Sequence, residues 1–265
     1  MRPVAVITGA SSGIGLEFAR KLAKTHDLVL VARRLDRLEE AKAELEKDFG
    51  AQVEVMVADL TDDSDLAAVE AKIAGEQRLG LLVNNAGIGL GVGPFWEKPL
   101  AAHEQMFKLH VIATMRLSHA ALGNLVAKDE GGVINVASVA GFLVRPCTAS
   151  YSTTKAWITS FTEALALDLR AAGSRVRVQA LCPGFTYTEF HDVLKVDRKK
   201  VAGEQYWMKA SDVVDASLAG FAKGKLVVVP GWRYKALVGV LGSLPRWLRQ
   251  VAIGVGTGKK LRALR

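Results

Sequence analysis

Short apolar runs alternate with longer amphipathic segments along most of the chain, and this alternation restricts the fold more than any other feature. The β-branched runs cover residues 4–8, 28–31, 53–57, 79–84, 132–138, 175–182 and 226–229. Helical patterns lie between them at 14–24, 35–48, 64–74, about 100–127, about 150–171 and 211–222. Unbroken apolar strands separated by helices are typical of a parallel sheet covered on both faces. We therefore predict one doubly wound α/β domain over residues 1–231, followed at 232–265 by a basic helical extension that is interrupted at Pro245.

The positive charge of the chain is confined to that extension. The whole chain has 35 Lys and Arg against 27 Asp and Glu, and residues 232–265 hold eight of the basic residues and no acid. The remaining 27 basic and 27 acidic residues balance, so the domain lacks the basic surface that nucleic-acid binding requires. The extension also carries Trp232, Tyr234, Trp247 and Leu248. Such a segment could lie on an anionic membrane surface, cover an edge of the sheet or form a subunit interface.

Cysteine and histidine spacing indicates neither a metal site nor a disulfide framework. Cys147 and Cys182 form no CxxC pair, and the five histidines include no HxxxH pair. The N-terminus has no long apolar segment with a small-residue cleavage site, and no stretch approaches the roughly 18 apolar residues of a transmembrane helix. These features predict a soluble, cytoplasmic protein with reduced thiols and no bound metal.

In doubly wound sheets the ligand lies beyond the carboxyl ends of the strands, so the residues after each apolar run are candidate site residues. The first run leads into Thr8-Gly9-Ala10-Ser11-Ser12-Gly13-Ile14-Gly15 and then a helical pattern. Glycines let a backbone approach a pyrophosphate closely, and the free N–H groups at a helix start favour an anion. This stretch predicts a nucleotide-binding loop, and the alternative is a tight structural turn.

Two arginines, Arg33 and Arg34, follow the second run, where an NAD enzyme commonly has an acid. An arginine fork pairs well with a 2′-phosphate, so NADP(H) is favoured over NAD(H); the alternative is a solvated helix start.

Asp59 and Leu60 follow the third run, where the carboxylate could accept from an adenine amine or cap the next turn. The fourth run ends in Asn84-Asn85-Ala86-Gly87, which suits close passage of a cofactor or a structural turn.

Tyr151 and Lys155 lie four residues apart in a helical pattern, which places their side chains on one face. A neighbouring ammonium favours the phenolate form of a tyrosine, whose ordinary pKa is about 10, and such a tyrosine can act as a general acid or base. Ser138 ends the fifth run thirteen residues earlier and could reach the same pocket. Taken alone, these residues also fit an amphipathic helix with a solvated lysine and a serine that forms a strand-end turn.

Taken together, the motifs resemble the short-chain dehydrogenase/reductase family in order and spacing. They are TGASSGIG at 8–15, NNAG at 84–87, Ser138, Tyr151-x-x-x-Lys155 and Pro183-Gly184. The resemblance covers residues 4–231. It implies a Rossmann fold with a seven-stranded parallel sheet flanked by helices, and reversible hydride transfer between a nicotinamide and a carbonyl or alcohol. It also implies a homodimer or homotetramer built on the long helices after Leu100 and Ser150.

The resemblance further implies a role for each site residue. Tyr151 would protonate the carbonyl oxygen, Lys155 would lower the pKa of Tyr151 and hold the nicotinamide ribose, and Ser138 would hydrogen-bond the substrate oxygen. Thr188 would anchor the carboxamide. With the strand-end residues above, the predicted cofactor contacts are Gly9, Ser11, Ser12, Gly13, Ile14, Gly15, Arg33, Arg34, Asp59, Leu60, Asn85, Ala86, Gly87, Tyr151, Lys155, Pro183, Gly184, Thr186 and Thr188.

His110 departs from the family pattern. The family commonly has an asparagine here, which holds a water that relays protons toward Lys155, whereas this chain reads Leu109-His110-Val111. Histidine can donate, accept and carry a proton near neutral pH, so our hypothesis is that His110 sustains the relay in altered form. The alternative is a core histidine with satisfied hydrogen bonds and a broken relay.

Residues 185–210 match the family's substrate lid and are rich in apolar and aromatic side chains. These are Phe185, Phe190, Val193, Leu194, Tyr206, Trp207 and Met208, amid Lys195, Arg198, Lys199 and Lys200, with Phe142, Leu143 and Val144 after Ser138. They suit a hydrophobic ketone such as a 3-oxoacyl thioester, a steroid or a lipid carbonyl. The alternative is that these aromatics pack the lid itself.

We therefore predict an NADP(H)-dependent carbonyl reductase or alcohol dehydrogenase acting on a hydrophobic substrate. The rival is a non-catalytic NADP(H)-binding sensor or scaffold of the same fold. Ser138, Tyr151 and Lys155 count against this rival, because a protein that only binds the cofactor has no need of a catalytic acid.

Overall fold

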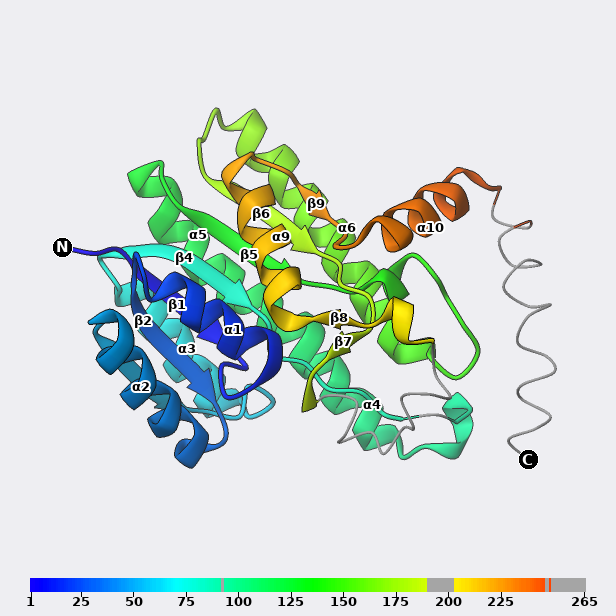
Figure 1. The fold of residues 1–265 in the computed structure, drawn as a ribbon, viewed down its shortest axis with the longest axis horizontal. Coiled ribbons are helices and arrows are strands. Elements are labelled where there is room, and N and C mark those ends of the chain that lie inside the picture. Colours follow the sequence, from blue (N-terminus) through cyan, green and yellow to red (C-terminus); the bar gives the residue numbers. More distant parts are fainter. Residues whose placement is uncertain (92, 190–202, 246–247, 249–265) are drawn as a thin grey trace.

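The computed structural model describes residues 1–91, 93–189, 203–245 and 248 (Figure 1). Over these residues a parallel seven-stranded sheet has the order β3-β2-β1-β4-β5-β6-β9. Its strands are β1 (Val4–Thr8), β2 (Asp27–Ala32), β3 (Val53–Val57), β4 (Leu79–Asn84), β5 (Gly132–Val136), β6 (Arg177–Leu181) and β9 (Val227–Val228). The predicted doubly wound α/β fold is confirmed. The strand order reverses between β1 and β4, and ligands bind at such a point in α/β sheets.

Helices cover both faces of the sheet. Helices α1 (Gly13–Leu22), α2 (Leu35–Phe49) and α9 (Ala210–Ala222) share one hydrophobic cluster with the strands. Helices α3 (Asp63–Gly75), α5 (Thr114–Lys128) and α6 (Ala149–Ala171) contribute to the cluster on the other face. Side chains of β1 alternate between the two, since Ala5 and Ile7 belong to the first cluster and Val4 and Val6 to the second. Burial on both faces explains why each strand is apolar throughout.

The segment that the sequence predicts as one long helix from about 100 to 127 is interrupted. It begins with α4 (Leu100–Phe107), continues as a π-helical turn η2 (Lys108–Ala113) and ends with α5. A π-helical turn adds a residue to the helix and re-aims the side chains around it, and such turns are frequent at functional sites. Here the turn contains His110.

The predicted lid and the predicted extension pack against each other. Residues Thr186–Tyr187 (β7) pair with Met208–Lys209 (β8), and η4 (Glu204–Tyr206) precedes β8. Phe190, Val193, Leu194, Lys195, Arg198, Lys199 and Lys200 lie outside the described residues. Helix α10 (Trp232–Ser243) follows β9 and ends before Pro245, as the proline predicts.

The first turn of α10 is part of the domain. Tyr234 is only 5% exposed, and its hydroxyl donates to the Tyr206 carbonyl at 2.7 Å and accepts from the Phe185 N–H at 3.0 Å. This turn of α10 therefore packs on the predicted domain, and the domain boundary at residue 231 stays a prediction. Trp247 and residues 249–265 of the extension lie outside the described residues.

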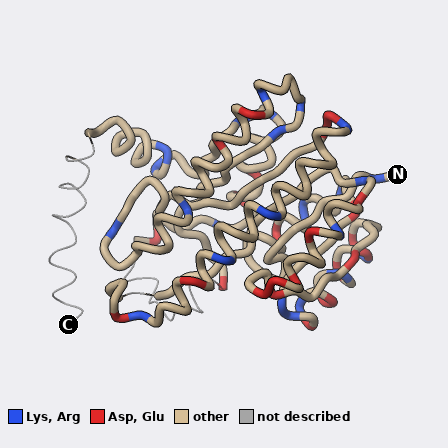
Figure 2. Tube along the Cα trace, turned by 180° about the vertical axis from the view of Figure 1, so that it is seen from behind, with Lys and Arg blue, Asp and Glu red and all other residues tan. Residues whose placement is uncertain are grey.

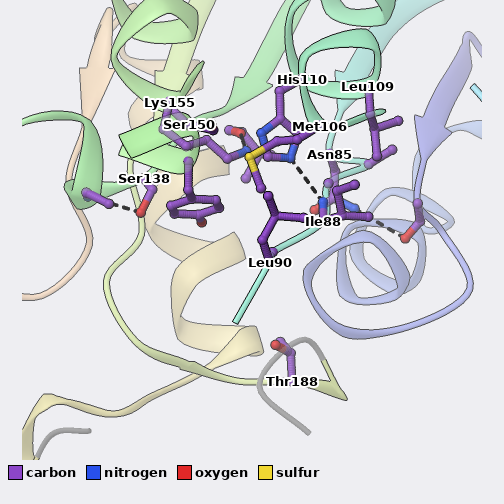
Figure 3. A pocket seen from close by; sticks show the side chains of 18 of the residues that line it. Asn85, Ile88, Leu90, Met106, Leu109, His110, Ser138, Ser150, Lys155 and Thr188 are labelled. Carbon is purple, nitrogen blue, oxygen red and sulfur yellow. Dashed lines mark hydrogen bonds between the residues drawn. The ribbon is translucent and has the colours of Figure 1, made fainter. Parts of the chain in front are cut away.

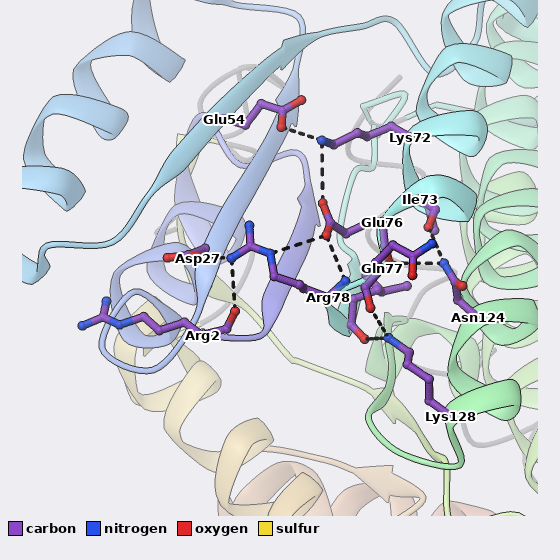
Figure 4. Close-up of polar contacts among 11 residues, drawn as sticks. Arg2, Asp27, Glu54, Lys72, Ile73, Glu76, Gln77, Arg78, Asn124 and Lys128 are labelled. Carbon is purple, nitrogen blue, oxygen red and sulfur yellow. Dashed lines mark hydrogen bonds and ion pairs between the residues drawn. The ribbon is translucent and has the colours of Figure 1, made fainter.

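Polar contacts at the amino ends of β2 and β4 tie the sheet together away from the strand ends that carry the motifs (Figure 4). Asp27 accepts from the Arg78 guanidinium at 2.6 Å, and Arg78 also donates to the Arg2 carbonyl at 3.3 Å. Lys72 pairs with Glu54 at 2.5 Å.

Acidic and basic residues are interleaved along the helices of the face seen in Figure 2. Among the described residues, no helix is long and apolar enough to cross a membrane.

Candidate active site

A pocket of about 870 Å³ lies at the carboxyl ends of the central strands. Every residue predicted from the sequence as a catalytic or cofactor-contacting residue lines it, with the exception of Gly15. Figure 3 shows Ser138, Ser150, Lys155 and His110 gathered at one end, with Thr188 on a separate segment. Among the residues that the structure describes, there is no group of three side chains suited to hold a metal ion.

The glycine-rich turn between β1 and α1 presents backbone to the pocket. Gly9 and Gly13 have φ angles of +65° and +57°, a region that favours glycine. Ser12, the N-cap of α1, makes no side-chain capping bond, and the first turn has no acid. The backbone N–H groups of this helix start are therefore available for an anion, and the turn fits the diphosphate of a dinucleotide.

Gly15 does not line the pocket, and its assignment as a cofactor contact stays a prediction. A Cβ atom on Gly15 would collide with the Gly9 carbonyl and would lie 2.5 Å from Asn85 Nδ2. That amide donates to the Thr8 and Gly9 carbonyls at 2.9 and 3.2 Å. Gly15 thus allows the helix start, the glycine turn and the NNAG segment to pack closely. Its absent side chain determines the conformation of the turn.

Arg34 spans the pocket from the end of β2. Its guanidinium lies 2.9 Å from a Glu189 carboxylate oxygen and donates to the Ser11 hydroxyl at 3.1 Å. All three residues line the pocket. Because the Arg34 side chain is close to half exposed, this ion pair is weak, and a bound anion can compete for it.

Arg33 lies beside Asp59 at the same end of the pocket, with the two charged groups 3.5 Å apart. Asp59 also accepts from the backbone N–H and the hydroxyl of Thr61 at 3.0 and 2.8 Å. The capping role suggested for this carboxylate is therefore present. Asp59 also lines the pocket, so its position fits both interpretations, the cap of the next turn and the acceptor for an adenine amine.

Ser138 and Tyr151 meet where β5 ends and α6 begins. Ser138 caps the short helix η3 (Val139–Gly141) by accepting from the Ala140 N–H at 3.1 Å. Burial raises the pKa of Tyr151, and its hydrogen bond with Ser138 acts in the opposite direction without cancelling the effect. Tyr151 is therefore a protonated phenol at neutral pH, which is the form that a general acid needs.

Lys155 lies on the same helix face as Tyr151, but the pKa of Tyr151 is still raised. Its Nζ atom is 6.0 Å from the centroid of the Tyr151 ring and donates to the Val136 carbonyl at 2.8 Å. Burial lowers the pKa of Lys155 to about 8, against the opposing effect of Cys182. Burial therefore dominates the pKa of Tyr151, and the predicted lowering of that pKa by Lys155 stays a prediction.

His110 is buried, and both of its ring nitrogens are hydrogen-bonded. Nε2 accepts from the Ile88 N–H at 3.0 Å (Figure 3), and Nδ1 lies 2.9 Å from the Thr154 hydroxyl. Because that hydroxyl donates to the Tyr151 carbonyl, Nδ1 must carry the proton of a neutral ring. Burial and the nearby Lys155 charge hold the pKa of His110 well below its ordinary value. These contacts favour the alternative of a core histidine with satisfied hydrogen bonds, and a proton relay through His110 stays a prediction.

The described aromatic residues of the predicted lid mainly pack against one another. Trp207 is buried, with its ring 5.3 Å from that of Phe185 and 5.2 Å from that of Tyr187. Of the three residues, only Phe185 lines the pocket. The alternative that these aromatics pack the lid is therefore favoured for the described residues.

Several pocket residues were missed by reasoning from the sequence. The hydrophobic wall comes from the loop after β4, from α4 and from α10, and three polar residues, Lys98, His103 and Ser150, lie beside it. The missed residues are Leu90, Lys98, His103, Met106, Ser150, Tyr234 and Leu237. Only Ser150 carried a usable signal, since it directly precedes Tyr151.

A family model described as short chain dehydrogenase matches residues 3–199. The chain belongs to this family. A short-chain dehydrogenase from Sphingobium yanoikuyae in complex with NADPH is similar in structure, with 36% identity, a TM-score of 0.82 and coverage of 92% of this chain and 97% of that one. A bulky-bulky ketone specific alcohol dehydrogenase from Comamonas testosteroni shares 31% identity, with a TM-score of 0.77 and coverage of 92% and 95%.

Among curated relatives, the very-long-chain 3-oxoacyl-CoA reductase of Homo sapiens is 26% identical over 98% of this chain and 80% of its own length. As a short chain dehydrogenase, the protein is an oxidoreductase that acts on carbonyl or alcohol groups with a nicotinamide cofactor. The seven-stranded Rossmann fold implied by the sequence motifs agrees with this family.

Proposed function

We propose that this short chain dehydrogenase transfers a hydride between NADP(H) and a hydrophobic ketone or the corresponding alcohol. The observation that carries the proposal is that Ser138, Tyr151 and Lys155 line the same pocket as the glycine-rich turn and the two arginines. A non-catalytic sensor would need the turn and the arginines but not the acid.

Tyr151, Ser138 and Lys155 each have a separate role in this reaction. The nicotinamide, when bound, supplies or accepts the hydride. Tyr151 gives its phenolic proton to the carbonyl oxygen of a ketone, and Ser138 donates a hydrogen bond to the same oxygen. The raised pKa of Tyr151 keeps the phenol protonated before the reaction. The Lys155 ammonium then stabilises the phenolate that forms, and this attraction exists only while Lys155 keeps its proton.

The preference for NADP(H) rests on Arg33 and Arg34. A 2′-phosphate near them would replace Asp59 and Glu189 as the partner of one or both guanidinium groups, and arginine binds phosphate more strongly than a solvated carboxylate. The NADPH bound by the Sphingobium protein is consistent with this preference.

The hydrophobic substrate is supported by the pocket wall and by two relatives. Leu90, Met106, Val139 and Leu143 line the pocket beside Ser138 and Tyr151. The similar proteins include one described as specific for bulky ketones and one that reduces very-long-chain 3-oxoacyl-CoA. We propose a ketone of this size class, such as a 3-oxoacyl thioester, a steroid or a lipid carbonyl.

A panel of such ketones, incubated with NADPH or with NADH, tests the function through loss of the reduced cofactor's absorbance. We expect turnover of at least one bulky ketone with NADPH, and a lower KM for NADPH than for NADH. An Arg34→Leu variant should raise the KM for NADPH toward that for NADH while leaving the KM for NADH nearly unchanged. Tight binding of NADPH without turnover of any ketone would favour the sensor instead.

We also propose that the protein is cytoplasmic and forms a homodimer or homotetramer through the long helices. Ile112, Met115 and Leu167 are exposed apolar side chains on η2, α5 and α6, which supports an interface there. Sedimentation velocity should give a mass at least twice that of the chain. A purely monomeric protein would overturn this part of the proposal.

Peripheral membrane contact through residues 232–265 is a separate proposal. Trp232 supports it, because its side chain is 70% exposed, whereas the burial of Tyr234 removes one of the aromatic residues that suggested it. The full chain should co-sediment with anionic but not with neutral vesicles. Equal recovery with both kinds of vesicle would contradict electrostatic binding.

A further inference from the structure

The pocket wall contains a buried polar pair that the proposed chemistry does not use. His103 of α4 and Ser150 in the first turn of α6 are each 7% exposed, and both line the pocket. The Ser150 Oγ and His103 Nδ1 atoms are 2.8 Å apart. Polar groups buried among apolar side chains cost free energy unless they are paired, so this pair requires an explanation.

The contacts of His103 fix the direction of its bond with Ser150. His103 Nε2 lies 3.2 Å from the Phe95 carbonyl, and a carbonyl oxygen can only accept, so Nε2 carries the proton of the neutral ring. Nδ1 is then the acceptor, and Ser150 donates its one hydroxyl proton to it. The Phe95 ring, with its centroid 4.4 Å from that of His103, holds the imidazole in place.

As a result, the Ser150 oxygen can only accept further hydrogen bonds. Its proton is committed to His103, and among the described residues no donor is bonded to Ser150 Oγ. In the proposed function Ser138 and Tyr151 have the opposite role, since both would donate hydroxyl protons to the reacting oxygen. Ser150 directly precedes Tyr151 in α6, so the acceptor belongs to the same turn of helix as the acid.

We infer that Ser150 is a specificity-determining residue that accepts a hydrogen bond from a hydroxyl group beside the reacting carbonyl, and that His103 positions it. The inferred substrate class is a hydrophobic hydroxyketone. The inference rests on the proposed function and narrows it. A ketone without the hydroxyl leaves the Ser150 oxygen buried without a donor, and sites built to pair with a substrate group discriminate against analogues that lack it.

The test compares two hydrophobic ketones that differ only by a hydroxyl on the carbon next to the carbonyl. Wild type should prefer the hydroxyketone in kcat/KM, and Ser150→Ala should reduce this preference about 3- to 10-fold, the value of one hydrogen bond. The loss should be in KM, and the simple ketone should be nearly unaffected. Ser150→Thr keeps the hydroxyl and should retain the preference.

Thr153→Ala is the matched control. Thr153 is an exposed residue of the same turn, and its hydroxyl bonds to the Ala149 carbonyl. This variant should leave the preference unchanged. His103→Phe should weaken the preference less than Ser150→Ala does, because the freed Ser150 hydroxyl is no longer held as an acceptor but can still accept a hydrogen bond. If Ser150→Ala does not fold, Ser150→Cys replaces it, since a thiol fills a similar volume but is a weak acceptor.

Two outcomes would overturn the inference, and they are distinguishable. If wild type and Ser150→Ala show the same ratio for the two ketones, Ser150 does not read the hydroxyl, and the proposed function stands. If wild type binds NADPH but reduces neither these ketones nor any ketone of the wider panel, the proposed function itself fails. The NADPH affinity and melting temperature of each variant show whether the fold is intact.

Discussion

Burial of the Lys155 ammonium opposes the stability of the fold. The folded protein releases the Lys155 proton at a pKa of about 8, whereas the unfolded chain holds it up to the ordinary value of 10.5. Between these values the unfolded chain binds more protons, so the free energy of unfolding should rise with pH. The cost of burying the ammonium is present in full below pH 8 and is relieved above it.

A Lys155→Met variant tests this cost. The difference in unfolding free energy, variant minus wild type, should fall between about pH 8 and 10 by an amount on the order of 2 kcal/mol, because only wild type gains stability there. Urea unfolding of both proteins at the two pH values measures it. Parallel pH dependence in the two proteins would contradict the lowered pKa.

His110 should not titrate in the pH range where an exposed histidine does. The shape of the pH–rate profile between about pH 5 and 8 should therefore be the same in wild type and in His110→Asn. The KM for NADPH should rise in the variant, because the shorter asparagine side chain does not reach as far as His110 Nε2 toward the Ile88 N–H in the loop beside the glycine turn. His119→Asn, which changes an exposed histidine of α5, should alter neither quantity. An inflection that disappears in His110→Asn would restore His110 as a proton carrier.

The spacing of Tyr151 and Lys155 predicted one helix face, and the structure has both residues in one pocket. Spacing could not predict their pKa values, because these depend on burial by residues far away in the sequence. His110 shows the same limit. The sequence allowed a proton carrier or a satisfied core residue, and the hydrogen bonds to Ile88 and Thr154, which favour the second, could not be predicted from it.

At the scale of elements, the turn from β1 to α1 depends on close backbone packing at Gly15. Gly15→Ala should destabilise the protein by roughly 1–3 kcal/mol, because the added methyl group meets backbone that cannot move freely. NADPH binding should weaken with it. Urea unfolding measures the first effect, and a fluorescence titration the second.

Gly123→Ala provides the matched control for this substitution. Gly123 is an exposed residue of α5 with open space around its Cβ position, so alanine should stabilise the helix by up to about 1 kcal/mol. If Gly15→Ala were as stable as wild type, the close packing of the turn would be contradicted.

The strands and most helices were predictable because burial on both faces leaves unbroken apolar runs, as in β1 and β4. The π-helical turn at Lys108–Ala113 was not predictable, since an added residue hardly disturbs the helical pattern over so long a segment. Strands β7 and β8 were missed as well. Each has two residues, too few to show an alternating pattern.

At the scale of the whole molecule, α10 closes one side of the pocket. Tyr234 and Leu237 line the pocket, and Tyr234 joins the segments at Phe185 and Tyr206. The excess of basic residues suggested that residues 232–265 form a separate extension. Composition cannot reveal that Tyr234 packs against the domain. The first turn of α10 thus packs on the domain that the motifs define.

Tyr234→Phe tests this connection. Loss of the hydroxyl removes two hydrogen bonds, so we expect destabilisation by about 1–2 kcal/mol in urea unfolding. Trp232→Ser, at an exposed position of the same helix, should change stability by less than about 0.5 kcal/mol. Equal stability of Tyr234→Phe and wild type would show that α10 is not tied to the domain through this residue.

The central claim is that Tyr151 is the acid of a hydride-transfer site, and Tyr151→Phe tests it most directly. The measurement is the rate of NADPH oxidation with the best ketone of the panel, alongside the dissociation constant for NADPH. We predict that Tyr151→Phe binds NADPH within a few-fold of wild type but loses turnover by a factor of about 100 or more, as expected for removal of a general acid. A variant that kept the full rate of turnover would contradict the account.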